Sequence, residues 1–98
     1  MKYVINNNYG GYEVPEEVQK LTGLKTWDAS DEARTNQVFI DWVMKHQNDP
    51  ECDLCVVEVP EEATDTYLYD YDGVETMLVV INGKIEVAPC LMEESFYA

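Results

Sequence analysis

The sequence contains very little positive charge. Six of its 98 residues are lysine or arginine, against 20 aspartates and glutamates, which gives a formal net charge of −14. Arg34 is the single arginine. Binding to nucleic acid or to an anionic membrane surface requires clusters of basic side chains. The composition therefore argues against direct binding to either, and it favours solubility and fast encounter with basic proteins.

Long apolar runs and an even set of cysteines are also missing. No run approaches the roughly 20 residues that span a bilayer. The first residues pass into asparagines without the apolar segment or cleavage site of a signal peptide. Three cysteines do not suit a closed framework of disulfides. We therefore expect a cytoplasmic protein whose cysteines are buried or half-buried thiols.

The residues that are present indicate one folded domain. Hydrophobic residues make up 46% of the chain, which is too many for a disordered segment of similar charge. A chain of this length can hold one modest core. We expect a single domain over residues 1–98, with residues 92–98 as a flexible or weakly docked tail.

Helix signals occur twice. Pro15 suits the first turn of a helix, and Gly23 suits a left-handed cap at its end. Thr35 or Asn36 can cap a second, longer helix, because its side chain can accept hydrogen bonds from the free amides of the first turn. Trp27 lies in the polar loop between the two helices, and we expect it to enter the core.

Strand signals occupy the start and the second half of the chain. Residues 3–5, 54–59 and 66–71 have strand-like patterns. Asp72-Gly73 and Asn82-Gly83 are hairpin turn signals, which predict a β-meander. The sequence thus predicts an α+β fold, with two helices packed on one face of a small, mostly antiparallel sheet of four or five strands.

Five short motifs lie along most of the chain: residues 2–7 with Tyr9-Gly10-Gly11, then residues 34–36, 57–62, 71–75 and 81–85. Together they resemble a group of small proteins encoded in bacteriophages and prophages. The resemblance implies a phage protein in the host cytosol and an α+β fold, and it transfers no catalytic residue. Small acidic phage proteins are often inhibitors that occupy basic surfaces of host enzymes, sometimes by imitating DNA.

The densest group of carboxylates is interleaved with tyrosines. It consists of Glu58, Glu61, Glu62, Asp65, Tyr67, Tyr69, Asp70, Tyr71, Asp72 and Glu75. Carboxylates on a strand and turn can imitate the phosphates of a duplex, and tyrosines add contact area at little entropic cost. The favoured hypothesis is an inhibitor of a host protein with a basic, nucleic-acid-handling surface. The alternative for these residues is a solvated edge whose tyrosines pack on the meander core.

A second hypothesis is an oligomeric protein that binds a nucleotide or another small ligand. Its candidate residues are Asn6, Asn7, Asn8, Tyr9, Gly10, Gly11 and Tyr12, with Arg34. A strand, a glycine-bearing loop and a helix start form the general layout of anion-binding loops. The oligomer would form by edge pairing of the meander.

A third hypothesis is a structural module stabilised by zinc, with His46, Cys52, Cys55 and Cys90 as its four ligands. Against it, the chain has only one C-x-x-C pair, and that pair precedes a strand. No serine or cysteine has a histidine partner that its spacing can specify. We therefore expect neither an enzyme nor a cofactor.

Overall fold

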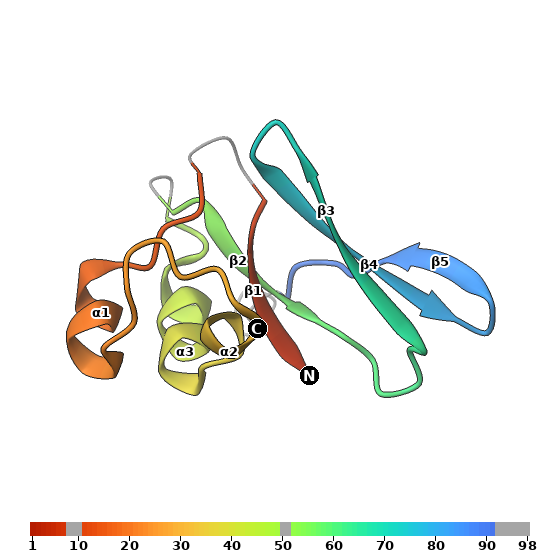
Figure 1. The fold of residues 1–98 in the computed structure, drawn as a ribbon, viewed down its shortest axis with the longest axis horizontal. Coiled ribbons are helices and arrows are strands. Elements are labelled where there is room, and N and C mark those ends of the chain that lie inside the picture. Colours follow the sequence, from red (N-terminus) through yellow and green to blue (C-terminus); the bar gives the residue numbers. More distant parts are fainter. Residues whose placement is uncertain (8–10, 50–51, 92–98) are drawn as a thin grey trace, which may run out of the picture.

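The computed structural model describes residues 1–7, 11–49 and 52–91, so the expected tail at residues 92–98 lies outside the described residues. The fold is α+β, as predicted (Figure 1). The elements in chain order are β1 (Lys2–Asn6), α1 (Glu16–Thr22), α2 (Asp31–Arg34), α3 (Gln37–His46), β2 (Leu54–Glu58), β3 (Asp65–Tyr71), β4 (Val74–Ile81) and β5 (Lys84–Val87).

The strands form two antiparallel sheets, and the prediction of a single sheet is wrong. One sheet pairs β1 with β2, and the other is the meander β3–β4–β5. The smaller sheet cannot extend further because both of its edges are occupied. Along β1, Arg34 donates to the carbonyl of Val4 at 3.1 Å, and Glu75 accepts from the amide of Asn6 at 2.8 Å. Along β2, the amide of Leu91 donates to the carbonyl oxygen of Val56 at 2.7 Å.

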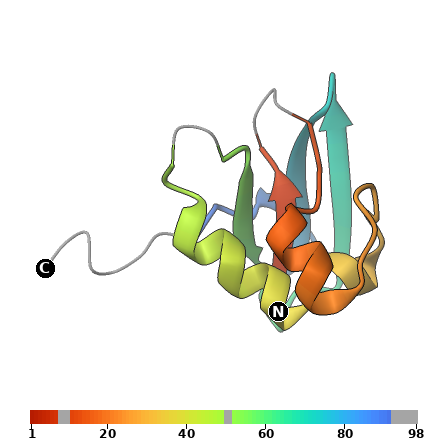
Figure 2. The same ribbon diagram turned by 90° about the vertical axis from the view of Figure 1, so that its left-hand side faces the viewer.

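The β1–β2 sheet is the middle of three layers. The helices cover one of its faces and the meander covers the other, as Figures 1 and 2 show from two sides. Val4 and Val56 face the helical layer, where they pack with Phe39. Tyr3 and Val57 face the meander. The continuous burial of β2 follows from this position, because a strand covered on both faces has apolar side chains on both.

Local signals determine where two of the helices begin or end. Gly23 ends α1 in the left-handed region, with a φ of 78°. Asn36, rather than Thr35, caps α3 by accepting hydrogen bonds from the amides of its first turn. The sequence did not predict α2, a four-residue helix capped by Ser30, because a single turn is too short to show apolar periodicity.

The predicted burial of Trp27 is wrong, since 74% of its surface is exposed. Trp27 is the third residue of a turn in which the Asp28 amide donates to the Lys25 carbonyl at 3.1 Å. The turn is fixed on both sides, because the Val14 amide donates to the Thr26 carbonyl at 2.8 Å. The central residues of such a turn lie at the surface, so the indole has no route to the core.

Candidate functional site

The side of the meander that faces away from β1 and β2 is mostly apolar, and none of the helices or strands in the described residues covers it. Met77 and Val79 point into the core, so their neighbours Leu78 and Val80 point outward. Directly paired residues share a face. The pairings therefore place ten residues together on this side, which we call the tyrosine face: Asp65, Tyr67, Tyr69, Tyr71, Val74, Thr76, Leu78, Val80, Ile85 and Val87.

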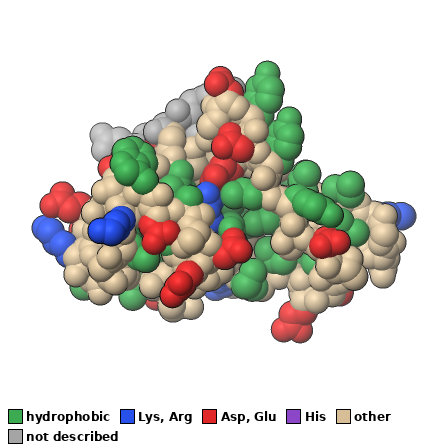
Figure 3. All heavy atoms as spheres, in the orientation of Figure 1, with side chains coloured by type: hydrophobic (Ala, Val, Ile, Leu, Met, Phe, Trp, Pro, Cys, Tyr) green, Lys and Arg blue, Asp and Glu red, His purple; other side chains and the backbone are tan. Residues whose placement is uncertain are grey.

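On the tyrosine face the side chains from the two outer strands are exposed, and those from the central strand β4 are half-buried. Tyr67 and Tyr69 are each 53% exposed, Tyr71 is 69% exposed, and Ile85 on β5 is 68% exposed. Figure 3 shows hydrophobic side chains gathered on the meander, away from the helices. The alternative that the tyrosines pack on the core is therefore wrong. An antiparallel sheet with one face in water normally has polar residues on that face, so this surface has the composition of one that another molecule covers.

The carboxylates predicted to accompany the tyrosines do not form one row. Asp65 lies at the start of β3 on the tyrosine face, and Asp72 lies in the turn that follows β3. Glu61 and Glu62 are exposed in the connection from β2 to β3. Asp70 is on the opposite face of β3 and accepts a hydrogen bond from the Gly73 amide at 3.0 Å. The exposed acids therefore lie around the tyrosine face, mainly at its ends.

Glu75 is not part of this surface, which corrects the prediction. It is buried and forms two hydrogen bonds with Arg34, at 2.8 Å and 2.7 Å. Burial opposes the charged form of Arg34, but the hydrogen bonds and charge of Glu75 outweigh this effect and raise its pKa. Glu58 is also engaged, because its carboxylate pairs with the N-terminal ammonium of Met1 at 2.7 Å.

The predicted nucleotide site is not assembled by the described residues. Arg34 is only 3% exposed, and its guanidinium donates to Glu75 and to two backbone carbonyls, so it is not available to an external anion. Asn6 is buried and donates to the Gly73 carbonyl at 2.7 Å. The Tyr12 hydroxyl donates to the Asp28 carbonyl at 2.7 Å, and its ring lies 4.4 Å from the Arg34 guanidinium carbon.

The remaining residues of that hypothesis give it no support. Asn7 is exposed and its amide nitrogen lies 3.1 Å from the sulfur of Cys90. Gly11 has a φ of 85°, which suits a turn. Asn8, Tyr9 and Gly10 lie outside the described residues. The strand, loop and helix are present in the predicted order, but the basic group that would attract an anion is neutralised.

The predicted zinc ligands do not come together. Cys55 and Cys90 form a disulfide, which also corrects the expectation that all the cysteines are thiols. The bridge between Val57 and Cys90 explains this pairing, because it places Cys90 along the edge of β2. The third cysteine, Cys52, is a half-buried thiol. In residues 1–7, 11–49 and 52–91, no group of three or more potential ligands is placed to hold a metal ion.

His46 has a structural partner at the end of α3. Its Nδ1 atom lies 2.7 Å from the carbonyl oxygen of Trp42, and the two rings stack with their centres 4.0 Å apart. A histidine near the C-terminal end of a helix commonly interacts with the last carbonyls. The side chain is therefore explained by the helix end and by its aromatic neighbour.

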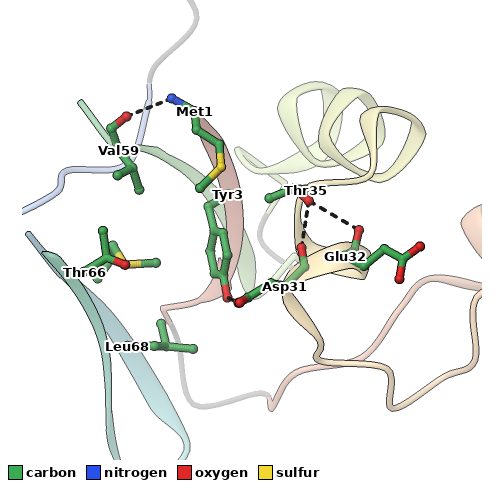
Figure 4. Close-up of a pocket in the computed structure, with 9 residues that line it drawn as sticks. Met1, Tyr3, Asp31, Glu32, Thr35, Val59, Thr66 and Leu68 are labelled. Carbon is green, nitrogen blue, oxygen red and sulfur yellow. Dashed lines mark hydrogen bonds between the residues drawn. The ribbon is translucent and has the colours of Figure 1, made fainter. Parts of the chain in front are cut away.

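Sequence reasoning missed a cavity beside β3, on the side opposite to the tyrosine face. Its volume is about 410 Å³, and we call it the edge cavity. It is lined by Met1, Tyr3, Asp31, Glu32, Thr35, Val59, Thr66, Leu68 and Met77. Figure 4 shows Tyr3 between Asp31 on one side and Leu68 on the other. The Tyr3 hydroxyl donates to Asp31 Oδ1 at 2.5 Å, and burial together with this hydrogen bond raises the pKa of Tyr3.

Sequence reasoning also missed the part of the tyrosine face that β4 and β5 contribute. The signal was the unbroken apolar run Met77–Ile81, which has no polar residue on either face of the strand. Such a run indicates a strand that is covered on both sides. In the described chain only one side of β4 is covered.

Comparisons with known proteins leave the site to be interpreted from its geometry alone. No protein-family model matches the chain, and neither the curated proteins nor the solved structures give a match. None of the helices in the described ranges combines the length and the apolar character needed to cross a membrane.

Proposed function

We propose that the protein binds another protein through the tyrosine face and covers a basic surface on that partner. The uncovered apolar face of the meander carries this proposal. Exposed tyrosines on an interface supply large contact area at low entropic cost, and they are frequent among the residues that dominate binding energy. Tyr69 lies near the middle of β3, so it is the expected centre of the contact.

The charges around the tyrosine face favour a basic partner. Asp65 and Asp72 lie at the two ends of β3, and Glu61 and Glu62 lie on the connection before it. A complementary surface has an apolar centre and a basic rim. A second copy of this chain would instead bring one net charge of −14 against another, which opposes self-association.

Binding of this kind would inhibit the partner by occlusion. Basic protein surfaces commonly bind nucleic acid, so the partner that we propose is a protein that handles nucleic acid. The resemblance to small phage proteins supports a host protein as the target. Because the acids surround an apolar centre and do not form a row, their arrangement supports covering a surface more than imitating the phosphates of DNA.

The test is capture from a bacterial lysate on the tagged protein, followed by mass spectrometry, with washes at low and high salt. A rim variant combines Glu61→Gln, Glu62→Gln, Asp65→Asn and Asp72→Asn. A matched control has the same change in charge on the helical side, with Glu13→Gln, Glu17→Gln, Asp41→Asn and Asp49→Asn. A face variant combines Tyr67→Ser with Tyr69→Ser.

We expect one basic protein to be retained by the wild type and the control. It should be lost from the rim variant, from the face variant and from the high-salt wash, because the contact is both electrostatic and apolar. The purified partner should then lose nucleic-acid binding at a one-to-one ratio of added protein. Retention that depends on neither salt nor the two variants would contradict the proposal.

A further inference from the structure

The tyrosine face alone is too small to account for a stable protein complex. The strands β3, β4 and β5 have 7, 8 and 4 residues. With strands about 4.8 Å apart and a rise of about 3.3 Å per residue, the sheet they form covers roughly 300 Å². A stable interface buries about 800 Å² on each partner. The partner must therefore contact further surface, and the edge cavity is adjacent. Thr66 and Leu68 of β3 line that cavity, while Tyr67 between them belongs to the tyrosine face.

The edge cavity combines an apolar floor with an acidic wall. Val59, Leu68 and Met77 form the apolar part. On the side of α2, the Asp31 carboxylate points to the Tyr3 hydroxyl, whereas the Glu32 side chain points away from Tyr3 and Leu68 (Figure 4). Both α2 residues are exposed, so their carboxylates can be reached from solvent. A long side chain that ends in a cation matches this combination, because its methylene stem can lie on apolar surface while its charged end pairs with a carboxylate.

The cations already near the cavity are neutralised by other groups. The Met1 ammonium donates to the Val59 carbonyl at 2.8 Å and pairs with Glu58 at 2.7 Å. The Arg34 guanidinium is paired with Glu75. No lysine or arginine side chain is among the residues that line the cavity. Among the described residues, the carboxylates of Asp31 and Glu32 therefore form no ion pair.

The charge of the wall decides the class of ligand. An anion would be repelled by Asp31 and Glu32. A neutral apolar group would cover the Asp31 carboxylate without pairing it, and an unpaired carboxylate removed from water is strongly destabilising. Only one Asp31 oxygen has a donor in the described residues, the hydroxyl of Tyr3. The other oxygen remains able to accept a charge-assisted hydrogen bond.

We infer that the edge cavity is the subsite that holds a lysine or arginine side chain of the partner protein. This inference rests on the proposed function, because it takes the bound partner to lie over the tyrosine face and to extend around the edge of β3. Lysine and arginine share the chemistry that the cavity recognises, an aliphatic stem with a terminal cation.

The test uses small probes on the intact protein, without the partner. N-acetyl-lysine methylamide and N-acetyl-arginine methylamide carry the cation. N-acetyl-norleucine methylamide and N-acetyl-citrulline methylamide are their neutral counterparts. Binding is followed by the methyl NMR signals of Leu68 and Met77. We expect saturable shifts with the cationic probes, at dissociation constants in the millimolar range, and no saturable shift with the neutral ones.

Two conservative variants test which carboxylate binds the cation of the probe. Asp31→Asn keeps an acceptor for the Tyr3 hydroxyl and should weaken binding of the cationic probes about tenfold, the loss expected for one charge-assisted hydrogen bond. Glu32→Gln, at an exposed position, should weaken it less and gives an independent measurement if Asp31→Asn perturbs folding. Glu62→Gln, outside the cavity, is the control and should change nothing. The arginine and lysine probes compared directly show which side chain the cavity prefers.

Equal binding of neutral and cationic probes would overturn the inference, as would the absence of saturable shifts. Shifts spread over all acidic surfaces would also overturn it, since they indicate unspecific attraction to a protein of this charge. Failure of the proposed function is distinguishable from these results. The Tyr69→Ser variant should bind the probes as the wild type does, and the face variant tests partner binding without reference to the cavity.

Discussion

Arg34 of α2 and Glu75 of β4 form a buried, doubly hydrogen-bonded ion pair that also closes the free edge of β1. Their nitrogen–oxygen distances are 2.8 Å and 2.7 Å. The same pair of side chains binds the Val4 carbonyl and the Asn6 amide, which would otherwise be unpaired edge groups. The pair thus takes the place of a neighbouring strand and links the helical layer to the meander. Covering an edge in this way also prevents pairing with another chain.

Removing one member of this pair should strongly destabilise the fold. Glu75→Gln leaves the Arg34 guanidinium buried with its charge uncompensated, for which we expect a loss of about 3–5 kcal/mol in the free energy of unfolding. Urea denaturation measures the loss. The double variant Arg34→Met with Glu75→Leu removes both charges and should be more stable than either single variant. If Glu75→Gln unfolds at the wild-type urea midpoint, the pair does not hold the layers together.

The disulfide between Cys55 and Cys90 should be a second source of stability. Its two cysteines are separated by 35 positions in the sequence. Restricting the unfolded chain by a loop of this length stabilises the fold by about 4 kcal/mol in the chain-entropy account. We expect reduction, or Cys90→Ala, to lower the free energy of unfolding by this order. Cys52→Ala is the control and should have a much smaller effect. Equal urea midpoints with and without reductant would contradict the prediction.

Substitutions on the tyrosine face should separate binding from stability. Tyr69 is about half exposed, so Tyr69→Ser should lower the free energy of unfolding by less than about 1 kcal/mol. The same change should weaken partner binding at least tenfold, because a central tyrosine is a typical dominant contact. Leu68→Ser is the contrasting variant, since Leu68 packs on the core and its loss should reduce stability. Comparable unfolding losses for the two variants would show that Tyr69 serves the fold.

The parts of the fold that sequence reasoning predicted correctly depend on local chemistry. Both hairpin turns follow the Asp-Gly and Asn-Gly signals, with positive φ values of 53° at Asp72 and 52° at Asn82. The cap at Asn36 is also a local interaction. The division into two sheets depends instead on Arg34 meeting Glu75, which is 41 residues away, and spacing along the chain does not encode that contact.

Only part of the candidate site was predicted from the sequence, because the rest depends on contacts between residues that are distant in the chain. Strand alternation placed the three tyrosines on one face of β3, and the structure confirms it. The contribution of Ile85 and Val87 depends on the register of β4 with β5. The edge cavity is lined by residues of α2, β1, β3 and β4, so it depends on how these elements are placed, and α2 was not predicted. Surfaces formed by one strand can be read from sequence, whereas those formed between layers require the packing.

Tyr12 should make the fold sensitive to alkaline pH. Burial raises the pKa of Tyr12 from its ordinary value of 10.0 to about 12, although the charge of Arg34 acts in the opposite direction. The unfolded chain therefore loses this proton near pH 10, while the folded protein keeps it until about pH 12. In that window the unfolded state binds fewer protons, so the free energy of unfolding falls as pH rises. The contribution is fully present below pH 10.

Tyr3 should act in the same direction, because burial and its hydrogen bond to Asp31 raise its pKa as well. The measurement is the urea midpoint followed from neutral pH to above pH 10. Phenylalanine cannot ionise, so the urea midpoint of the Tyr12→Phe variant should fall less steeply with pH than that of the wild type. In the double variant with Tyr12→Phe and Tyr3→Phe, the urea midpoint should depend on pH even less. Parallel curves for the wild type and both variants would show that other groups cause the alkaline loss, and that neither phenol is held in its neutral form by the fold.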